Sequence, residues 1–287
     1  MINQLSITAL AENTAGVFDV AGEWGLSLWI QADHHRILCD TGGGQSIEYN
    51  SRLLGIDLAT ADILVISHGH YDHTGGLSAL VDGGFRGKIY AHPAALDTKY
   101  SRQKKVPHKS VGIPAASRQV LQSCGADFIQ SAGPTEIAPG IVLTGSIPRR
   151  NRFEDSYDKA HFLDENCTQP DLFLDDQALL IQTPRGWAVI TGCCHAGLIN
   201  TLEYAVELTG NGHMCAVLGG LHLFNAPPER VEATIEKMEA FGVELLAPCH
   251  CTGFKPIVGL QQRFGSRFVA LQAGVTLTIA GAAPATE

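Results

Sequence analysis

The sequence predicts an α/β protein, and three observations lead to this prediction. Short apolar runs with strand character are separated by turn residues, such runs alternate with helical stretches, and 45% of the 287 residues are hydrophobic. A chain of this size can bury a substantial core, and its 17% content of charged residues is typical of globular rather than disordered proteins.

The first half of the chain is expected to form one sheet with helices packed on it. Its first three strands should pair antiparallel, because turn residues, notably the run from Asp40 to Gly44, separate them. A helix is expected over residues 74–80. The predicted strands cover residues 5–9, 26–31, 36–39, 63–66 and 88–91.

The second half repeats the alternation, with strands expected over residues 178–182, 187–191, 215–218, 244–247 and 275–279. Four strands of the chain are followed within a few residues by a histidine, namely His68, His195, His222 and His250. Because ligand sites in α/β sheets lie at strand ends on one side of the sheet, these histidines are expected to converge. No internal repeat or linker is visible, so residues 1–287 are predicted to form a single domain.

Two irregular segments, residues 97–114 and 148–171, are expected to be loop insertions in this domain. The first has few apolar anchors and should be a long exposed loop, serving either as solvated surface or as a lid over a site. Its basic residues are Lys99, Arg102, Lys104, Lys105 and Lys109, and the second segment contributes Arg149, Arg150 and Arg152.

Composition excludes several classes of protein. The net charge of −9 argues against a general nucleic-acid binder, which needs a basic face. No apolar stretch is long enough to span a membrane and the first residues lack a basic leader, so a cytoplasmic protein is expected. The cysteines in Cys193-Cys194-His195 and Cys249-His250-Cys251 are expected to be reduced thiols near a metal or in the core.

The strongest local signal is the sequence SHGHYDHTGG, which begins at Ser67 directly after an apolar strand. Its imidazoles and carboxylate are ligands that zinc, iron and manganese share, whereas an ordinary polar turn has no need of three histidines. Its glycines let the backbone fold tightly around an ion. The candidate metal ligands are His68, His70, Asp72 and His73.

This HxHxDH pattern resembles the signature of the metallo-β-lactamase superfamily. The resemblance implies an αββα sandwich, in which two mixed sheets pack together with helices on both outer faces. It also implies two divalent ions, with zinc as the first choice and iron or manganese as alternatives: His68 and His70 would hold one, and Asp72 and His73 the other. Asp40, in a turn like the family's LxDxG, would orient a ligand histidine.

The chain departs from the family pattern after residue 191. Gly192-Cys193-Cys194-His195 stands where many members have Gly-Asp, so His195 or a neighbouring cysteine would replace the bridging carboxylate. No histidine stands clearly at the family's usual third-ligand position. Residues in that region with suitable side chains are His161, Asp175 and Asp176.

Two later histidines compete for the last ligand position. Both follow apolar strands, and we favour His250 as the ligand and His222 as a ligand or a substrate contact. On this interpretation the metal ligands are His68, His70, Asp72, His73, His195 and His250.

A narrower resemblance covers nearly the whole chain. It is to the branch named for 7,8-dihydropterin-6-yl-methyl-4-(β-D-ribofuranosyl)aminobenzene 5'-phosphate synthase, whose named activity joins a dihydropterin diphosphate to a ribosylaminobenzene phosphate. The segments that carry it are residues 11–13, 24–28, 54–58, 67–77, 145–149, 190–200 and 247–253.

The expected function is that of a metal-dependent hydrolase or transferase acting on a phosphorylated small molecule, with a pterin-related condensation as one form. Asp72 and His222 are the candidate catalytic residues, and Arg149, directly after an expected strand at 141–147, joins His222 as a candidate substrate contact. A non-haem di-iron redox protein and a non-catalytic metal-binding signalling protein are the alternatives. The sequence leaves the oligomeric state open.

Overall fold

The computed structural model of the chain describes residues 1–102, 109–123, 128–154 and 160–280. Its strands are β1 (Gln4–Ala11), β2 (Ser27–Ala32), β3 (His35–Cys39), β4 (Ile63–Ile66), β5 (Lys88–Ala91), β6 (Tyr100–Ser101), β7 (Lys109–Ser110), β8 (Phe128–Gln130), β9 (Thr135–Ala138), β10 (Ile141–Leu143), β11 (His161–Phe162), β12 (Ala178–Thr183), β13 (Gly186–Thr191), β14 (Met214–Gly220), β15 (Leu245–Cys249) and β16 (Thr276–Ala280). Its α-helices are α1 (Ile47–Leu53), α2 (Tyr71–Thr74), α3 (Leu77–Asp82), α4 (Ala115–Ser123), α5 (Leu198–Thr209), α6 (Pro228–Ala240) and α7 (Phe254–Phe264). Short 3-10 helices are η1 (Leu58–Thr60), η2 (Pro93–Leu96), η4 (His250–Thr252) and η5 (Gly265–Arg267). Within the described ranges, no helix is both long and apolar enough to cross a membrane.

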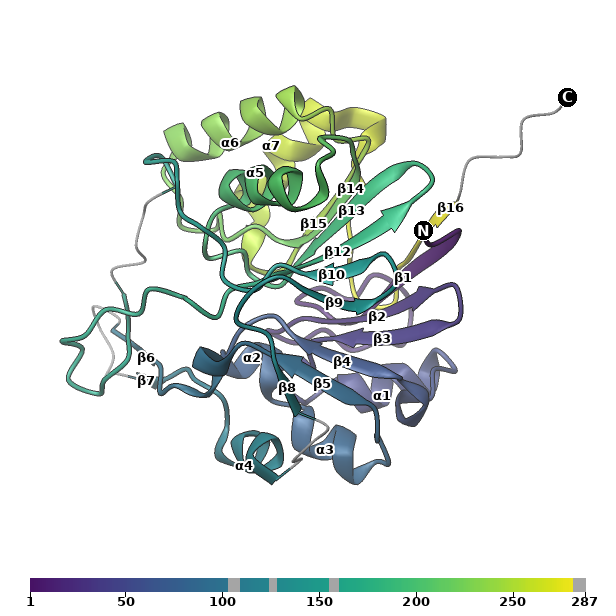
Figure 1. Cartoon of the computed structure of the whole chain (residues 1–287), viewed down its shortest axis with the longest axis vertical. Coiled ribbons are helices and arrows are strands. Elements are labelled where there is room, and N and C mark those ends of the chain that lie inside the picture. The colour runs from purple at the N-terminus through teal and green to yellow at the C-terminus, as the bar shows by residue number, and fades with distance from the viewer. Residues whose placement is uncertain (103–108, 124–127, 155–159, 281–287) are drawn as a thin grey trace, which may run out of the picture.

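Two large sheets lie face to face (Figure 1). Over the described residues, the first has the order β16-β1-β2-β3-β4-β5-β8 and the second the order β15-β14-β13-β12-β10-β9. Strands β1, β2 and β3 pair antiparallel as expected, whereas β3, β4, β5 and β8 are parallel. In the second sheet β13, β14 and β15 run parallel, so their carboxyl ends share one edge.

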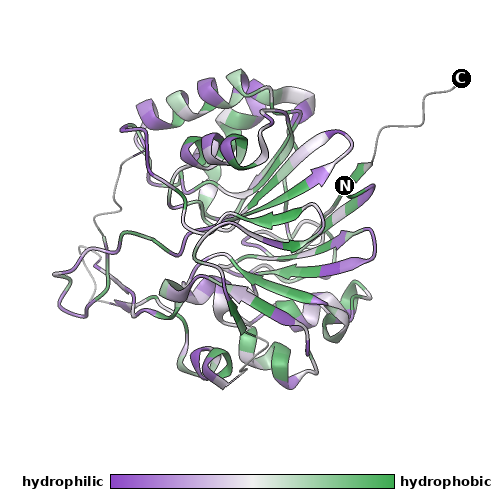
Figure 2. Cartoon of the chain, in the orientation of Figure 1, coloured by the Kyte–Doolittle hydropathy of each residue, from purple (hydrophilic) through white to green (hydrophobic). Residues whose placement is uncertain are grey.

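Three apolar clusters separate the layers. Ile7 and Ile30 of the first sheet belong to the same cluster as Ile181 and Leu218 of the second, which places this cluster between the sheets. A second cluster joins the outer face of the second sheet to α5, α6 and α7, and a third joins the first sheet to α1, α3 and α4. The strands are accordingly the most hydrophobic ribbons in Figure 2. The αββα sandwich expected from the resemblance is confirmed.

The helix expected over residues 74–80 is divided in two. Helix α2 ends at Thr74 and α3 begins at Leu77, with Gly75 and Gly76 between them. A Cβ atom on Gly75 would collide with the backbone of Gly43, so only a glycine lets the motif pack this closely on the turn after β3.

The prediction of an exposed loop over residues 97–114 is only partly right for its described part: residues 97, 98, 102, 109 and 110 are exposed, whereas residues 99, 101 and 111–113 are buried. Strands β6 and β7 pair with each other, β6 also pairs with β11, and Lys99 is only 1% exposed. Lys99 can be buried because two carboxylates from the second irregular segment and its continuation neutralise it. Lys104 and Lys105 lie outside the described residues.

Candidate metal centre

The loops that follow β4, β13, β14 and β15 meet around a cavity of about 510 Å³. Its lining includes His70, His195, His222 and His250, each of which comes shortly after one of these strands. The fold thus brings His70 together with histidines that lie more than a hundred residues further along the sequence, as the strand-end pattern predicts.

Three histidines form the first possible ligand set. One ring nitrogen from each of His68, His70 and His195 lies within 4.8 Å of the others, and all three residues are buried. The ring centroids of His195 lie 4.9 Å from His68 and 5.0 Å from His70. His195 therefore joins the two histidines that the motif itself provides.

Asp72, His73 and His250 form the second set. The Nε2 atoms of His73 and His250 are 3.2 Å apart, and Asp72 Oδ2 lies 3.5 Å from His250 Nε2. Of the two histidines that compete for the last position, the structure places His250 in this set. His222 lies beside His195 instead, with 4.2 Å between ring centroids; it forms a further possible metal-binding group with Cys193 and His195 and lines the cavity.

The chemistry of these donors fits a metal centre. His68 Nε2, His70 Nε2 and both ring nitrogens of His195 are buried without a hydrogen-bond partner among the described residues. Burial lowers the pKa of each of these histidines well below its usual range, so each imidazole is neutral, which is the form that ligates metals. Buried polar atoms are rarely left unpaired in proteins, and a bound ion would satisfy one nitrogen of each of the three rings.

Asp40 supports the motif from the turn after β3. Its Oδ2 lies 2.7 Å from His73 Nδ1, and its two oxygens accept hydrogen bonds from the amide and hydroxyl of Ser67. Burial alone would lower the pKa of His73, but the charge of Asp40 and their hydrogen bond raise it to about 9. This contact fixes the ring so that Nε2 faces the other ligands, the orienting role expected for Asp40.

A second support comes from the end of β1, for which the sequence predicts no role. Asn13 Oδ1 lies 2.9 Å from His250 Nδ1, and Glu12 Oε1 accepts a hydrogen bond of 2.7 Å from the amide of His250. Glu12 is only 4% exposed. A carboxylate directly after an apolar strand is the one sequence signal that could have indicated this role.

A buried ion triad supports the HxHxDH loop from the other side. Lys99 Nζ lies 2.8 Å from Asp171 Oδ2 and 3.0 Å from Asp175 Oδ1. The other oxygen of Asp175 accepts a hydrogen bond of 2.7 Å from the amide of Gly69, between two ligand histidines. Asp175 is thus held by Lys99 and does not belong to either ligand set.

The basic residues are distributed differently from the sequence expectation. Arg149 was expected to face the metal cleft, but it lines a different pocket together with Phe173, whose ring stacks on His195. Strand β10 ends at Leu143, four residues before the expected strand end, so the chain reaches Arg149 along a different path. Lys109 does line the metal cavity, as does His161, whose ring centroid is 5.2 Å from that of His70.

Backbone strain gathers around the same centre. Asp40, Cys194, His222 and His250 all have positive φ angles, between 47° and 62°. Side chains other than glycine rarely adopt this conformation, and such strain is frequent at functional sites.

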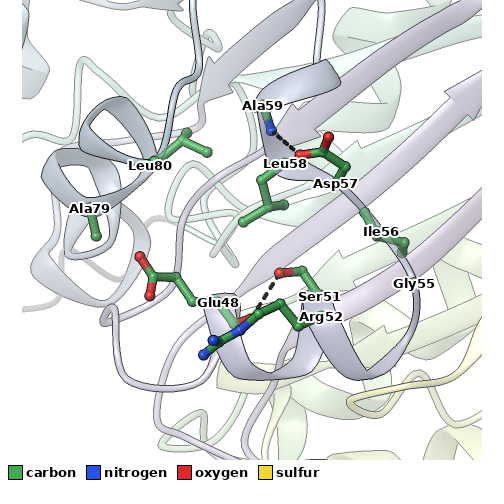
Figure 3. A pocket seen from close by; sticks show the side chains of 11 residues that line it. Glu48, Ser51, Arg52, Gly55, Ile56, Asp57, Leu58, Ala59, Ala79 and Leu80 are labelled. Atoms are coloured by element: carbon green, nitrogen blue, oxygen red, sulfur yellow. Dashed lines mark hydrogen bonds between the residues drawn. The ribbon is translucent and has the colours of Figure 1, made fainter.

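Another cavity, of about 420 Å³, lies between α1, η1 and α3 (Figure 3). Its Asp57 caps η1 by accepting a hydrogen bond from the amide of Ala59, and Arg52 donates to the backbone oxygen of Glu48. These polar groups complete local helix structure, so this cavity is not the candidate site.

Comparisons with known proteins agree with this geometry. Residues 25–147 match the family model described as the metallo-beta-lactamase superfamily. Over 285 residues, the chain is 28% identical to 7,8-dihydropterin-6-methyl-4-(beta-D-ribofuranosyl)-aminobenzene-5'-phosphate synthase of Methanocaldococcus jannaschii, with 95% of this chain and 96% of the relative covered.

Solved structures extend the comparison. The chain is similar to Tm1679, described as a metal-dependent hydrolase of the beta-lactamase superfamily, with a TM-score of 0.81, 30% identity, and coverage of 96% of this chain and 99% of that one. It also shares its fold with a diphosphatase from the PhnP family, with a TM-score of 0.54, 12% identity, and coverage of 97% and 98%.

Proposed function

Because this chain belongs to the metallo-β-lactamase superfamily, we propose that it is a metal-dependent enzyme acting on a small molecule that carries a phosphate or diphosphate. The observation that carries the proposal is that members of both donor sets, His70 and His195 of the first and Asp72 and His250 of the second, line one cavity together with the cation Lys109. In the proposed enzyme His68, His70 and His195 hold one ion, and Asp72, His73 and His250 hold the second.

When bound, two divalent ions would polarise the phosphoryl oxygens, offset charge on the leaving phosphate or diphosphate, and lower the pKa of water at the site. Around them, the side chains bind and orient the substrate. The ammonium group of Lys109, which lies 4.7 Å above the ring of Tyr71, meets charge on the phosphate at the cavity rim. His222, on the cavity wall, exchanges a proton with the substrate through its imidazole.

Aromatic residues at the rim favour a substrate that also contains a planar ring. Trp24 and Phe224 line the cavity, are 50% and 42% exposed, and lie edge to face with 6.2 Å between ring centroids. Exposed aromatic rings beside a polar site offer a surface on which a heterocycle can stack.

The finer proposal is a pterin-related condensation. The relative from Methanocaldococcus jannaschii is named for a product that combines a dihydropterin, an aminobenzene and a ribose phosphate. In the corresponding reaction here, the bond from a pterin methylene to diphosphate breaks, a bond from that carbon to the aminobenzene forms, and the aminobenzene gives up one proton to the solvent. The aromatic rim would bind the pterin and the metal side of the cavity the departing diphosphate.

The experiment compares reactions on protein of known metal content. Metal-loaded protein is assayed with a chromogenic phosphodiester and, separately, with a dihydropterin diphosphate plus a ribosylaminobenzene phosphate, by measuring released diphosphate. Turnover in either assay that is lost with a chelator is the expected result, and turnover in the second assay supports the condensation. Two bound ions without turnover in either would overturn the proposal, and reducible iron in such a sample would favour the redox protein.

Variants at the rim test how the substrate is bound. Lys109→Ala should raise KM by up to about five-fold, since an exposed ion pair is worth about 1 kcal/mol at most. Its control is Lys88→Ala, which removes an exposed lysine at the start of β5. An unchanged KM in the Lys109 variant contradicts the role given to this lysine.

A further inference from the structure

Cys193 lies between the two ligand sets. Its Sγ atom is 3.2 Å from His73 Nε2, and it forms one possible metal-binding group with His68 of the first set and His73 of the second. It also belongs to a group with His195 and to another with His250, and it is only 3% exposed. Within the described residues, Cys193 occurs in more of these groups than any other side chain.

The fold places this thiol by a close approach of two strand ends. Gly192, directly before Cys193, lies so near Ser67 that a Cβ atom on it would be 2.5 Å from the Cβ of Ser67. The absence of a side chain at Gly192 lets the end of β13 lie against the Asp40–Ser67 pair, which also fixes His73. The close approach of Gly192 to Ser67 therefore positions Cys193 beside the metal motif.

No other carboxylate competes for this central place among the described residues. Asp72 is the one carboxylate in the possible metal-binding groups of that part of the chain. Asp175 is engaged by Gly69 and Lys99, and Asp176 accepts a hydrogen bond from the amide of Ala196. Two divalent ions in a buried site would leave most of their charge uncompensated by Asp72 alone, and buried charge of this kind is costly.

We infer that Cys193 is a thiolate ligand shared by both metal ions, in the central place between the two sets. This inference rests on the proposed function only in assuming that two ions bind. When the ions bind, the S–H bond of Cys193 would break, its sulfur would serve as the ligand, and the proton would pass to the solvent. Cys251, whose Sγ donates a hydrogen bond to the backbone oxygen of Cys193, remains a neighbour outside the shared position.

The test follows cobalt binding to the metal-free full-length protein. A thiolate bound to Co²⁺ produces intense charge-transfer absorption in the near ultraviolet, and proton release can be measured in the same titration. Wild-type protein should develop this absorption, and Cys193→Ala should lose it and bind the second ion at least about ten-fold more weakly. Cys193→Asp should bind both ions without the absorption.

Two cysteine variants serve as controls. Cys194→Ala removes the adjacent buried thiol, whose Sγ lies 3.4 Å from Thr201 Oγ1 and packs among apolar residues beneath α5, and it should keep the absorption. Cys251→Ala should keep it as well. Absorption of full strength in Cys193→Ala, or its loss only in Cys251→Ala, overturns the inference.

Activity of the same cobalt-loaded samples separates this inference from the proposed function. Turnover of a phosphorylated substrate by wild-type protein that shows no thiolate absorption would overturn the role of Cys193 and leave the function standing. Thiolate absorption without turnover would support the role of Cys193 and overturn the proposed function.

Discussion

Replacing Lys99 with methionine tests how the interior of this fold carries charge near the metal motif. Lys99 lies 2.8 Å from Asp171 and 3.0 Å from Asp175, and none of the three side chains is more than 4% exposed. Each contact corresponds to about 5–6 kcal/mol of attraction at an effective dielectric constant of about 20, most of which is offset by desolvation of the ions. Removing one partner leaves the carboxylates unpaired, so Lys99→Met should lower the free energy of unfolding by about 3–5 kcal/mol.

The loss should depend on pH. Burial raises the pKa of Asp175, and the charge of Lys99 opposes this rise. Without Lys99, the folded-state pKa lies further above the unfolded value, so the folded variant binds a proton more readily than the unfolded chain does. Its stability is therefore recovered as the pH falls towards the new pKa, and the difference from wild type should be largest at high pH.

Urea denaturation of chelator-treated proteins measures both effects. Lys88→Met, which alters an exposed lysine in β5, is the control and should change the free energy of unfolding by no more than about 0.5 kcal/mol. A loss below about 1 kcal/mol in Lys99→Met, or a loss that does not shrink at lower pH, would refute the reasoning.

Three further predictions concern the metal motif and the helix beside it. His70→Ala removes a donor of the first set and should abolish metal binding at that set and activity together, so unchanged metal content by elemental analysis would contradict its role. In metal-free protein, burial holds the pKa values of the buried first-set histidines below the usual 6.5. Only the unfolded chain then gains protons as the pH falls through this value. Denaturation curves should therefore show a free energy of unfolding that decreases by up to about 1.4 kcal/mol per pH unit for each histidine. A free energy of unfolding that does not change with pH would contradict their burial as neutral rings. Glu154 accepts hydrogen bonds of 2.8 and 2.9 Å from the amides of Ile199 and Asn200 at the start of α5. Glu154→Ala should therefore lower the free energy of unfolding by about 1–2 kcal/mol, measured by thermal or urea denaturation. A change near zero would exclude a capping role.

Sequence patterns predicted the elements whose signals are local. Strands β4 and β5 have the predicted bounds, because each is a short apolar run between turn residues. Hydrophobic periodicity did not predict the break between α2 and α3. Gly75 and Gly76 are needed there for a close contact with a turn that is distant in the sequence, and periodicity reports only local structure. The burial of Lys99 was missed for a similar reason: its partners are 72 and 76 residues further along the chain.

The candidate site likewise has residues that the sequence predicts and residues that it does not. The residues from His68 to His73 form a compact motif, and His195 and His250 could be added because each follows an apolar strand. The groups that hold His250 could not be predicted, since Asn13 and Glu12 lie 237 and 238 residues before it and become neighbours only when β1 and β15 occupy their sheets. Arg149 was misplaced because its direction depends on where β10 ends.

Strand β1 has β2 on one side and β16 on the other, so strands from the two ends of the described chain are neighbours in the first sheet (Figure 1). On the ribosome, β1 emerges well before β16 and must wait for all the intervening residues before Thr276–Ala280 becomes available to it. During this interval, one row of its backbone amides and carbonyls is open to pairing with other nascent chains. Slowing translation of the last third should therefore lengthen the period in which newly made chains are captured by chaperones or aggregate, even though the finished protein keeps that strand edge covered.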